Sequence, residues 1–191
     1  NYQVIWCYEQ SPLQRVSDLL LHPKTLLIID KKVLDCFGED MDLDSSKIHI
    51  VAATEQAKTL EGVIAFFDFL KSKKADKGTK VVAVGGGIVQ EITAFASKCY
   101  QRGIDWVFCP TTLLAMSDSC IGGKSSLNYK GVKNQLGLFS PPTEIFININ
   151  FLNSLSLRDF QSGLGEILKI CILAGEEALF LYRNVIADAL E

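Results

Sequence analysis

The sequence predicts a doubly wound α/β fold around a mostly parallel sheet, followed by the first helices of an all-α domain. Two observations support this fold class. Short apolar runs alternate along the chain with segments of helical periodicity, a pattern typical of buried parallel strands joined by crossover helices. Three consecutive glycines at positions 85–87 also follow one apolar run and precede a helical pattern, as they do where a strand turns into a helix in such sheets.

The first domain is expected to span residues 1–150. Its apolar runs predict six strands, at residues 3–8, 25–29, 48–52, 80–84, 106–109 and 144–149. Because every residue from 81 to 84 is apolar, the fourth strand is expected to be buried on both faces. The spacing of apolar residues predicts helices between the strands, at residues 12–21, 33–37, 55–71, 88–100 and 112–116.

The pattern changes after residue 149, and residues 151–191 are expected to begin a second domain. Ser156 is a candidate N-cap for a helix that continues to about Ala174. A second helical pattern covers residues 176–191. We expect these helices to be the start of a helical domain that the sequence carries only in part. Because the chain begins with Asn1 rather than Met, it is also expected to lack a few native residues.

Composition narrows the classes of function. The chain has 191 residues, with 48% hydrophobic and 21% charged residues and a net charge of −3, so neither nucleic acid nor an anionic membrane is an expected partner. No apolar run approaches the ~20 residues needed to span a bilayer. Six scattered cysteines without a CxxC spacing favour buried free thiols in a reducing cytoplasm over disulfides.

Polar residues gather where the predicted strands end. Asp30, Glu55, the glycines at 85–87 and Thr111 follow four strands, and the carboxyl ends of parallel strands form one edge where ligands bind. Glycines before a helix let backbone N–H groups approach a pyrophosphate. Residues 118–134 add hydroxyls, carboxylate, lysines and an amide among glycines, which suits a polyhydroxylated, anionic ligand beside a dinucleotide.

The order of these motifs resembles the 3-dehydroquinate synthase and sugar phosphate cyclase family. The chain carries GGG at 85–87, RG at 102–103, PTTLL at 110–114, DS at 118–119, GGK at 122–124, KN at 133–134 and GLGEILK at 163–169. The resemblance runs from about Asp30 to Gly175. It implies a carbon–oxygen lyase that cyclises a sugar phosphate with loss of phosphate, as 3-dehydroquinate synthase does in the shikimate pathway of aromatic amino acid biosynthesis.

The resemblance also implies the cofactors and the mechanism. NAD oxidises one carbinol temporarily, the resulting ketone acidifies the neighbouring C–H so that phosphate is eliminated, and the hydride is then returned before ring opening and aldol closure. A divalent metal, zinc or cobalt, is implied in the full-length protein, where it polarises the hydroxyl being oxidised. The family further implies a cytoplasmic homodimer and a second domain that binds metal and substrate.

The family's functional residues match positions in this sequence. The resemblance implies a metal ligand in Glu166 and catalytic roles for Asp118, Lys124, Asn134, Lys169 and Arg102, the last reaching the phosphate pocket of a neighbouring subunit. It implies cofactor contacts from Asp30, Glu55, Lys58, Gly86, Gly87, Ile88, Glu91, Thr111, Thr112, Leu114, Ser119, Lys133, Phe151, Ser154 and Leu155.

Simpler structural roles stay open for several of these residues. Asp30 and the threonines of the PTTLL motif also fit helix capping. Glu55 and Lys58 fit a helix N-terminal acid and a surface lysine. Arg102 fits a cation at a helix C-terminus, and Glu166 with Lys169 fits an i,i+3 ion pair.

The sequence departs from the family pattern at two places. Gln90 and Glu91 follow the glycine turn where the family has Gly-Asp, so Gln90 adds a side chain that is expected to affect cofactor binding. The histidines, His22 and His49, match no family zinc ligand. We therefore expect this chain alone to be inactive. The alternatives are a cyclase for another heptulose phosphate, a glycerol-dehydrogenase-like metal alcohol dehydrogenase, and a non-catalytic nucleotide-binding or assembly module.

Overall fold

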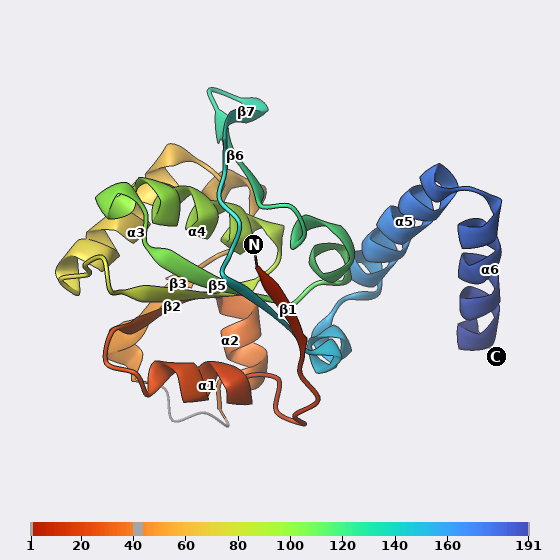
Figure 1. The fold of residues 1–191 in the computed structure, drawn as a ribbon, viewed down its shortest axis with the longest axis horizontal. Coiled ribbons are helices and arrows are strands. Elements are labelled where there is room, and N and C mark those ends of the chain that lie inside the picture. The colour runs from red at the N-terminus through yellow and green to blue at the C-terminus, as the bar shows by residue number, and fades with distance from the viewer. Residues whose placement is uncertain (1, 40–43, 191) are drawn as a thin grey trace.

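The computed structural model describes residues 2–39 and 44–190, and its centre is a parallel six-stranded sheet (Figure 1). The strands lie in the order β1-β8-β5-β4-β2-β3, and every neighbouring pair is parallel. Their bounds are β1 Gln3–Trp6, β2 Thr25–Asp30, β3 Ile48–Val51, β4 Lys80–Gly85, β5 Asp105–Pro110 and β8 Glu144–Ile147. All six predicted strands are confirmed, with shifts of at most two residues at their ends.

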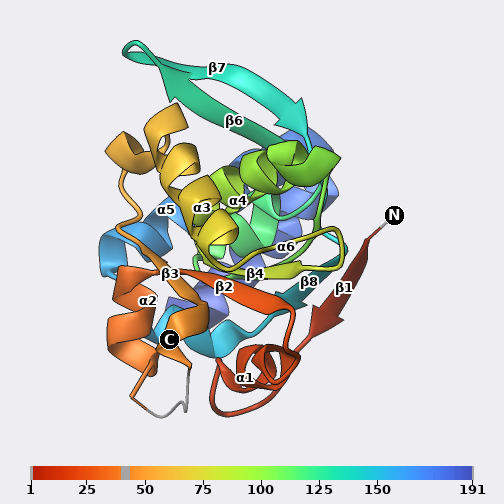
Figure 2. The same cartoon turned by 90° about the vertical axis from the view of Figure 1, so that its left-hand side faces the viewer.

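Helices cover both faces of the sheet, which confirms the doubly wound fold (Figure 2). One face packs against α3 (Leu60–Ser72) and α4 (Gly87–Cys99), the other against α1 (Gln14–Leu20) and α2 (Lys31–Phe37). Alternate residues of β4 point to the two layers. The buried clusters that result include Val81, Ala83, Phe66 and Ile92 on one side and Val82, Val84, Val16 and Val33 on the other.

Side-chain caps set the starts of three helices. Asp30 Oδ1 accepts a hydrogen bond from the Lys32 N–H at 3.0 Å at the start of α2. Ser156 Oγ accepts one from the Asp159 N–H at 3.1 Å, which confirms the predicted N-cap. The helix predicted from residue 55 is wrong at its start, because Glu55–Ala57 is a separate 3₁₀ turn and α3 begins after its own cap at Thr59.

An antiparallel hairpin follows β5 and was not expected as strands. β6 (Lys124–Tyr129) pairs with β7 (Val132–Phe139) and projects over the α3 and α4 layer (Figures 1 and 2). Its two turn residues, Lys130 and Gly131, have φ values of 47° and 81°. Left-handed backbone at both central positions is what a tight two-residue hairpin turn needs.

A single π-helical turn, Ala115–Ser119, stands where the sequence predicts a helix at 112–116. The Cys120 N–H donates to the Ala115 carbonyl at 3.0 Å, which is the i→i+5 bond of such a turn. The turn therefore extends the predicted helical segment by three residues and changes its geometry.

The C-terminal part is helical, as predicted. After the 3₁₀ segment Ile149–Ser154 come α5 (Leu157–Ala174) and α6 (Glu176–Leu190); of the predicted helix 176–191, Glu191 lies outside the described residues. α5 docks closely at Gly163, where a Cβ would lie 2.5 Å from Leu113 Cβ. The described residues contain no strand after Ile147.

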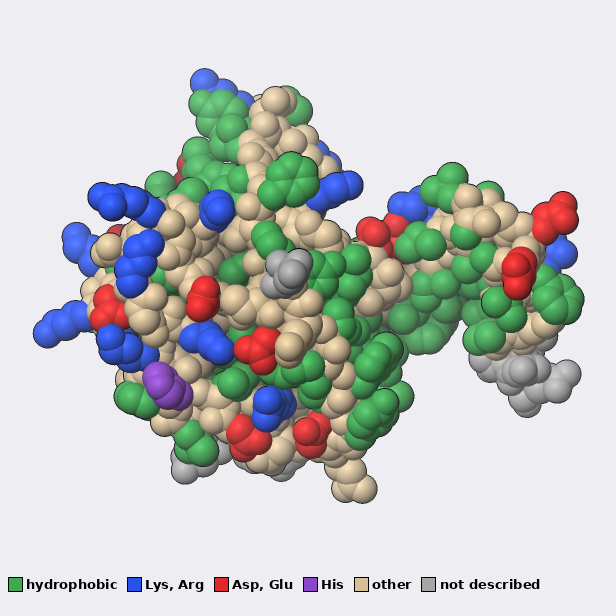
Figure 3. All heavy atoms as spheres, viewed as in Figure 1, with side chains coloured by type: hydrophobic (Ala, Val, Ile, Leu, Met, Phe, Trp, Pro, Cys, Tyr) green, Lys and Arg blue, Asp and Glu red, His purple; other side chains and the backbone are tan. Residues whose placement is uncertain are grey.

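The two C-terminal helices stand away from the sheet and carry exposed hydrophobic side chains (Figures 1 and 3). These side chains are Ile172, Leu173, Phe180, Leu181 and Val185, each more than half exposed. In the part of the chain that the structure describes, none of the helices has the length and apolar character to cross a bilayer.

Candidate functional site

A cavity of about 320 Å³ lies at the carboxyl edge of the sheet, where the sequence predicts a ligand site. It is bounded by the end of β2, the turn between β4 and α4, the segment after β5, and the start of α5. Its lining residues include Asp30, Lys32, Cys36, Gly86, Gly87, Ile88, Thr111, Thr112, Ser154 and Leu155. Most of these residues come from strand ends or helix starts, so the edge is built mainly by the topology of the sheet.

Backbone forms the centre of this first cavity. A Cβ on Gly85 would lie 2.6 Å from Val89 Cγ2, so a larger residue there would force a shift, and one on Gly86 would make a tight contact 3.1 Å from Thr112 Cγ2. Gly87 begins α4, and the first-turn N–H groups of a helix lack acceptors within the helix. These free N–H groups at the positive end of a 13-residue helix suit an anionic pyrophosphate.

The polar side chains of the cavity keep structural roles while they face it. Asp30 caps α2, as above, and its carboxylate lies at the cavity wall. The Thr111 N–H donates to the Gly85 carbonyl at 3.0 Å, and Thr112 Oγ1 accepts from the Ala115 N–H at 3.2 Å. Capping by Asp30 and Thr112 is therefore observed, and a ribose contact from Asp30 stays a prediction.

A second cavity of about 290 Å³ adjoins the first, and Gly87 lines both. Its other lining residues are Gln90, Glu91, Leu114, Asp118, Ser119, Ile121 and Lys124. Asp118 and Lys124 are both exposed on this wall. The structure thus brings the DS and GGK motifs together beside the glycine turn.

Glu166 and Lys169 of α5 form the ion pair that their spacing allows. The Glu166 side chain is 18% exposed, whereas that of Lys169 is 59% exposed. The hydrogen bond to Glu166 raises the pKa of the Lys169 ammonium, and Asp118 contributes in the same direction. The middle of α5 and the Ala115–Ser119 turn therefore contribute charges that interact, and Asp118 of the turn also lines the second cavity.

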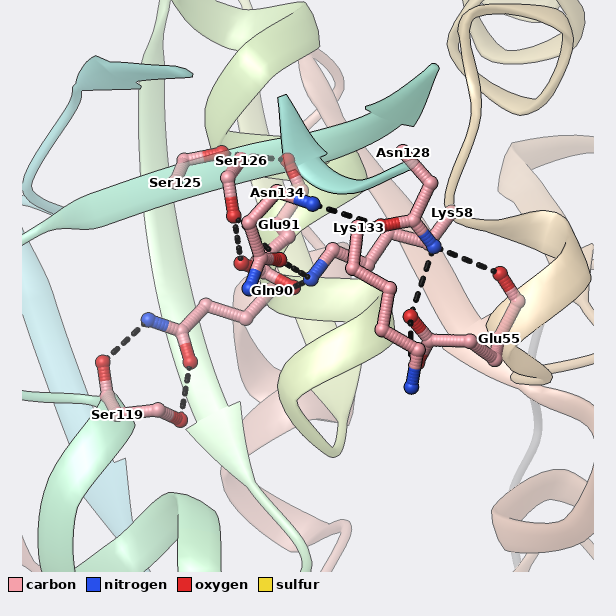
Figure 4. Close-up of polar contacts among 10 residues, drawn as sticks. All are labelled: Glu55, Lys58, Gln90, Glu91, Ser119, Ser125, Ser126, Asn128, Lys133 and Asn134. Atoms are coloured by element: carbon pink, nitrogen blue, oxygen red, sulfur yellow. Dashed lines mark hydrogen bonds and ion pairs between the residues drawn. The ribbon is translucent and has the colours of Figure 1, made fainter. Parts of the chain in front are cut away.

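A buried lysine organises a polar network beneath the hairpin (Figure 4). Lys58, only 6% exposed, pairs with Glu91 Oε2 at 2.6 Å and donates to Asn134 Oδ1 at 2.6 Å. Ser126 Oγ donates to Glu91 Oε1 at 2.9 Å and lies 3.0 Å from Asn134 Oδ1. Asn134 has a left-handed φ of 56°, which brings its side chain into the network that joins the start of α3, α4 and both hairpin strands.

Glu55 and Lys133 lie at the outer end of the same network. Asn128 Nδ2 donates to Glu55 Oε1 at 2.7 Å, and Lys133 Nζ is 3.8 Å from the same carboxylate. The Asn128 hydrogen bond lowers the pKa of Glu55, with Lys133 and Lys58 acting in the same direction. These residues line a separate hollow with Lys130, not the first cavity. Cofactor contacts from Glu55, Lys58 and Lys133 therefore stay predictions.

The side chain of Gln90 does not point into the glycine turn. It is 1% exposed and bonds to Ser119 across the second cavity. Phe151, expected at the cofactor, is 1% exposed in the core, where its ring meets that of Phe37 edge-on at 5.5 Å. Arg102 is exposed in the turn after α4, apart from both cavities as this chain forms them.

The cysteines are free, but only half of them are buried. Cys7, Cys109 and Cys120 are buried, Cys36 and Cys99 are exposed, and Cys171 is intermediate. The prediction of free thiols is consistent with the structure, and the prediction that they are buried is wrong for Cys36 and Cys99. Burial raises the pKa of Cys120 to about 11, so this thiol is held in its unreactive protonated form.

Of the metal ligands expected for the family, the described residues supply one candidate, the Glu166 carboxylate. Among the side chains that the structure describes, those of residues 2–39 and 44–186, no three His, Cys, Asp or Glu are grouped so that they could hold a metal ion. Glu166 is paired with Lys169, and the His49 ring packs on Phe66 and Phe69 with centroids 5.2 and 5.3 Å away. The described residues alone do not fit a structural or catalytic zinc site, which needs at least three protein ligands.

Comparison with known proteins agrees with this geometry. Residues 48–162 match the family model described as 3-dehydroquinate synthase N-terminal. A 3-dehydroquinate synthase from Clostridium tetani is 36% identical over 163 residues, covering 83% of this chain and 44% of the relative.

Solved structures give the same answer for the fold. ValA, a 2-epi-5-epi-valiolone synthase from Streptomyces hygroscopicus with NAD⁺ and Zn²⁺ bound, superposes with a TM-score of 0.79 and 30% identity, covering 90% of this chain and 49% of that one. A 2-deoxy-scyllo-inosose synthase with carbaglucose-6-phosphate, NAD⁺ and Co²⁺ has a TM-score of 0.74 and 25% identity, covering 89% and 48%. The chain thus spans about half the length of the relatives it matches.

Proposed function

Because the chain belongs to the 3-dehydroquinate synthase family, we propose that it binds NAD at the carboxyl edge of its sheet and serves the NAD-dependent cyclisation of a sugar phosphate with loss of phosphate. The observation that carries this proposal is the pair of cavities that meet at Gly87. One is suited to a nucleotide, and the other presents Lys124 and Asp118 to a neighbouring ligand. NAD⁺ in the two cyclase structures supports the same assignment.

The chain's own residues would hold NAD mainly through backbone. The N–H groups at Gly87 and Ile88 face the pyrophosphate, and Asp30 accepts from a ribose hydroxyl. Thr111 and Thr112 close the wall opposite the glycines, with Ser154 and Leu155 along the outer side. Because a Cβ would clash at Gly85 and crowd Thr112 at Gly86, the glycines keep the backbone of the turn open to the pyrophosphate.

The second cavity would hold the sugar phosphate. NAD, when bound, supplies reversible hydride transfer at a substrate carbinol. Lys124, a compact cation on a glycine-flanked strand, neutralises a phosphate or carboxylate, and Asp118 orients hydroxyl groups. Lys169 lies close enough to Asp118 for their charges to interact, so it adds a second cation to the same region.

A divalent metal ion would need protein ligands besides Glu166. Zn²⁺ and Co²⁺ are bound in the two cyclase structures. In this chain the Glu166 carboxylate is mostly buried and paired with Lys169. The Lys169 ammonium would have to leave this carboxylate before Glu166 could serve as a metal ligand.

A related cyclase acting on another heptulose phosphate is the second candidate. The support for it is the departure at Gln90 and Glu91 from the Gly-Asp pair that the resemblance predicts after the glycines, together with the place of Gln90 in the lining of the second cavity beside Asp118. Because this chain alone is expected to be inactive, binding rather than turnover separates the two candidates: in the presence of NAD, the Kd for 3-deoxy-arabino-heptulosonate 7-phosphate is compared with that for a heptulose 7-phosphate that lacks the carboxylate.

The proposed setting is a cytoplasmic homodimer. Free cysteines support a reducing compartment. Arg102 supports the dimer, because it is exposed on the turn after α4 and lines neither cavity of its own chain. Sedimentation of a monomer at tens of micromolar (about the range for modest dimers) would contradict this part.

Isothermal titration with NAD tests the proposal. The parent chain is expected to bind, and Gly86→Val is expected to weaken binding by at least about 100-fold, because a branched side chain would fill the pyrophosphate approach and press on Thr112. Gly165→Ala is the control, since a Cβ there has nothing within 4 Å. Equal affinity of Gly86→Val and the parent would sink the assignment.

A further inference from the structure

Gln90 has a buried side-chain amide, and both its NH₂ group and its oxygen form hydrogen bonds with Ser119. Its side-chain NH₂ donates to the Ser119 carbonyl at 2.5 Å, and its Oε1 accepts from the Ser119 hydroxyl at 2.7 Å. At 1% exposure these bonds are shielded from water, where an unmade hydrogen bond costs most. The pair fixes α4 to the end of the Ala115–Ser119 turn.

The turn that Gln90 holds is the wall of the second cavity. Leu114, Asp118 and Ser119 line that cavity from the turn, and Gln90 lines it from α4. The turn is π-helical, a geometry that is rare and often found at functional sites. A reciprocal amide–serine pair at its last residue therefore sets how far Asp118 stands from α4.

The distance between this wall and the glycine turn matters for a dinucleotide. With adenosine at Asp30 and pyrophosphate at Gly87, the other half of NAD must pass Gly87 into the second cavity, because Gly87 lines both. Ser119 Oγ lies 3.9 Å from the Cβ position of Gly87. The Gln90–Ser119 pair thus stands at the passage between the cavities.

We propose that Gln90 is a positioning residue, which holds the turn carrying Asp118 and Ser119 at the separation from Gly87 that the nicotinamide half of NAD requires. This inference rests on the proposed function. It assigns Gln90 no contact with the adenosine half, because Gln90 does not line the first cavity. It also requires a donor at this position, which a carboxylate lacks.

The experiment compares two ligands on the same variants. ADP-ribose has the adenosine, pyrophosphate and a ribose but no nicotinamide, whereas NAD has both halves. For Gln90→Met, of similar shape without the amide, and Gln90→Glu, which loses the donor, we expect the NAD Kd to rise about tenfold. The ADP-ribose Kd is expected to stay within about twofold of the parent value.

Controls separate positioning from general damage. Gln135→Met makes the same chemical change at an exposed residue of β7 and is expected to leave both affinities unchanged. Ser119→Ala removes one of the two hydrogen bonds and is expected to give the same pattern with a smaller effect, which keeps the test available if Gln90→Met does not fold.

Two results would overturn the inference. One is an unchanged NAD Kd in Gln90→Met and Ser119→Ala. The other is equal weakening of NAD and ADP-ribose, which a loss of fold would produce. If the parent chain binds neither ligand, the proposed function fails, and the role of Gln90 fails with it; a parent that binds both leaves the variants to decide on Gln90 alone.

Discussion

The glycine turn and the hairpin network are built in opposite ways, although α4 takes part in both. At the turn, backbone faces the cavity, and an added Cβ at Gly85 or Gly86 meets a neighbour. Under the hairpin, Lys58, Glu91 and Asn134 satisfy one another through side chains. At the turn, backbone N–H groups are free to bind a ligand, whereas the polar side chains of the network bind one another.

Because of this difference, a substitution at the glycine turn is expected to weaken ligand binding, and a substitution in the hairpin network is expected to lower stability. Adding atoms at the turn blocks a ligand while the sheet below stays packed. Removing atoms from the network leaves a charge without its partner in a mostly buried place, which costs more than the pair itself contributes. The two regions can therefore be told apart by what their variants lose.

The largest effect on stability is expected from Lys58→Met. The change leaves the Glu91 carboxylate, 20% exposed, without its cation, and we expect a loss of about 3 kcal/mol in the free energy of unfolding. Denaturant titration measures it. Lys24→Met is the matched control, because the Lys24–Asp76 pair is more than half exposed and ion pairs in water contribute little to stability.

A double variant sharpens the same point. Lys58→Met with Glu91→Leu removes both charges and is expected to recover part of the loss, because no unpaired charge stays behind. A Lys58→Met variant as stable as Lys24→Met would show that the network does not hold the hairpin.

The second-largest expected effect is that NAD bound in the first cavity protects the Cys36 thiol from labelling. Cys36 is exposed and lines the first cavity, so NAD at about ten times its Kd should slow labelling of Cys36 about tenfold. Cys99, exposed at the end of α4, is the control and should label at the same rate with and without NAD. Mass spectrometry of labelled peptides reports both sites, and equal rates at Cys36 would place NAD elsewhere.

The smallest expected effect is a pH dependence of the free energy of unfolding, caused by His49 where it packs against α3. Burial between Phe66 and Phe69 lowers the pKa of His49 from 6.5. The unfolded chain therefore takes up a proton first as pH falls below 6.5, and stability should decrease from there until the folded pKa is passed, by at most about 1.4 kcal/mol per pH unit.

His49→Phe is expected to flatten that dependence, while His22→Gln keeps it because His49 is retained. Unfolding titrations at pH 7.5 and 5.5 measure the difference. Equal pH dependence in the parent and His49→Phe would show that this part of α3 is not held by packing against a neutral imidazole.

The sheet could be predicted from the sequence because its strands are buried on both faces. Runs such as residues 81–84 are wholly apolar, and the glycines after them mark the edge where a ligand binds. The hairpin could not be found in this way, because Ser125 and Ser126 interrupt β6 with polar side chains and most of residues 132–139 are exposed. The signal available was Lys130-Gly131, a two-residue turn between stretches that favour strands.

The part of the candidate site that is formed by backbone could be predicted from the sequence. The part that is formed by side-chain contacts was harder to predict. Asp30, Gly86, Gly87 and Thr112 meet as expected, since strand ends share an edge. The Lys58–Glu91–Asn134 contacts depend on how the hairpin folds back. The Gln90–Ser119 pair depends on a π-helical turn, and neither feature has a periodicity that a sequence reveals.

Hydrogen exchange with and without NAD shows whether the cofactor binds the backbone of the glycine turn. If NAD lies on the backbone of the turn, the amides of residues 86–89 and 111–112 should exchange more slowly in its presence, while those of residues 176–186 in α6 stay unchanged. Protection that is absent at residues 86–89, with NAD shown to be bound, would contradict the account.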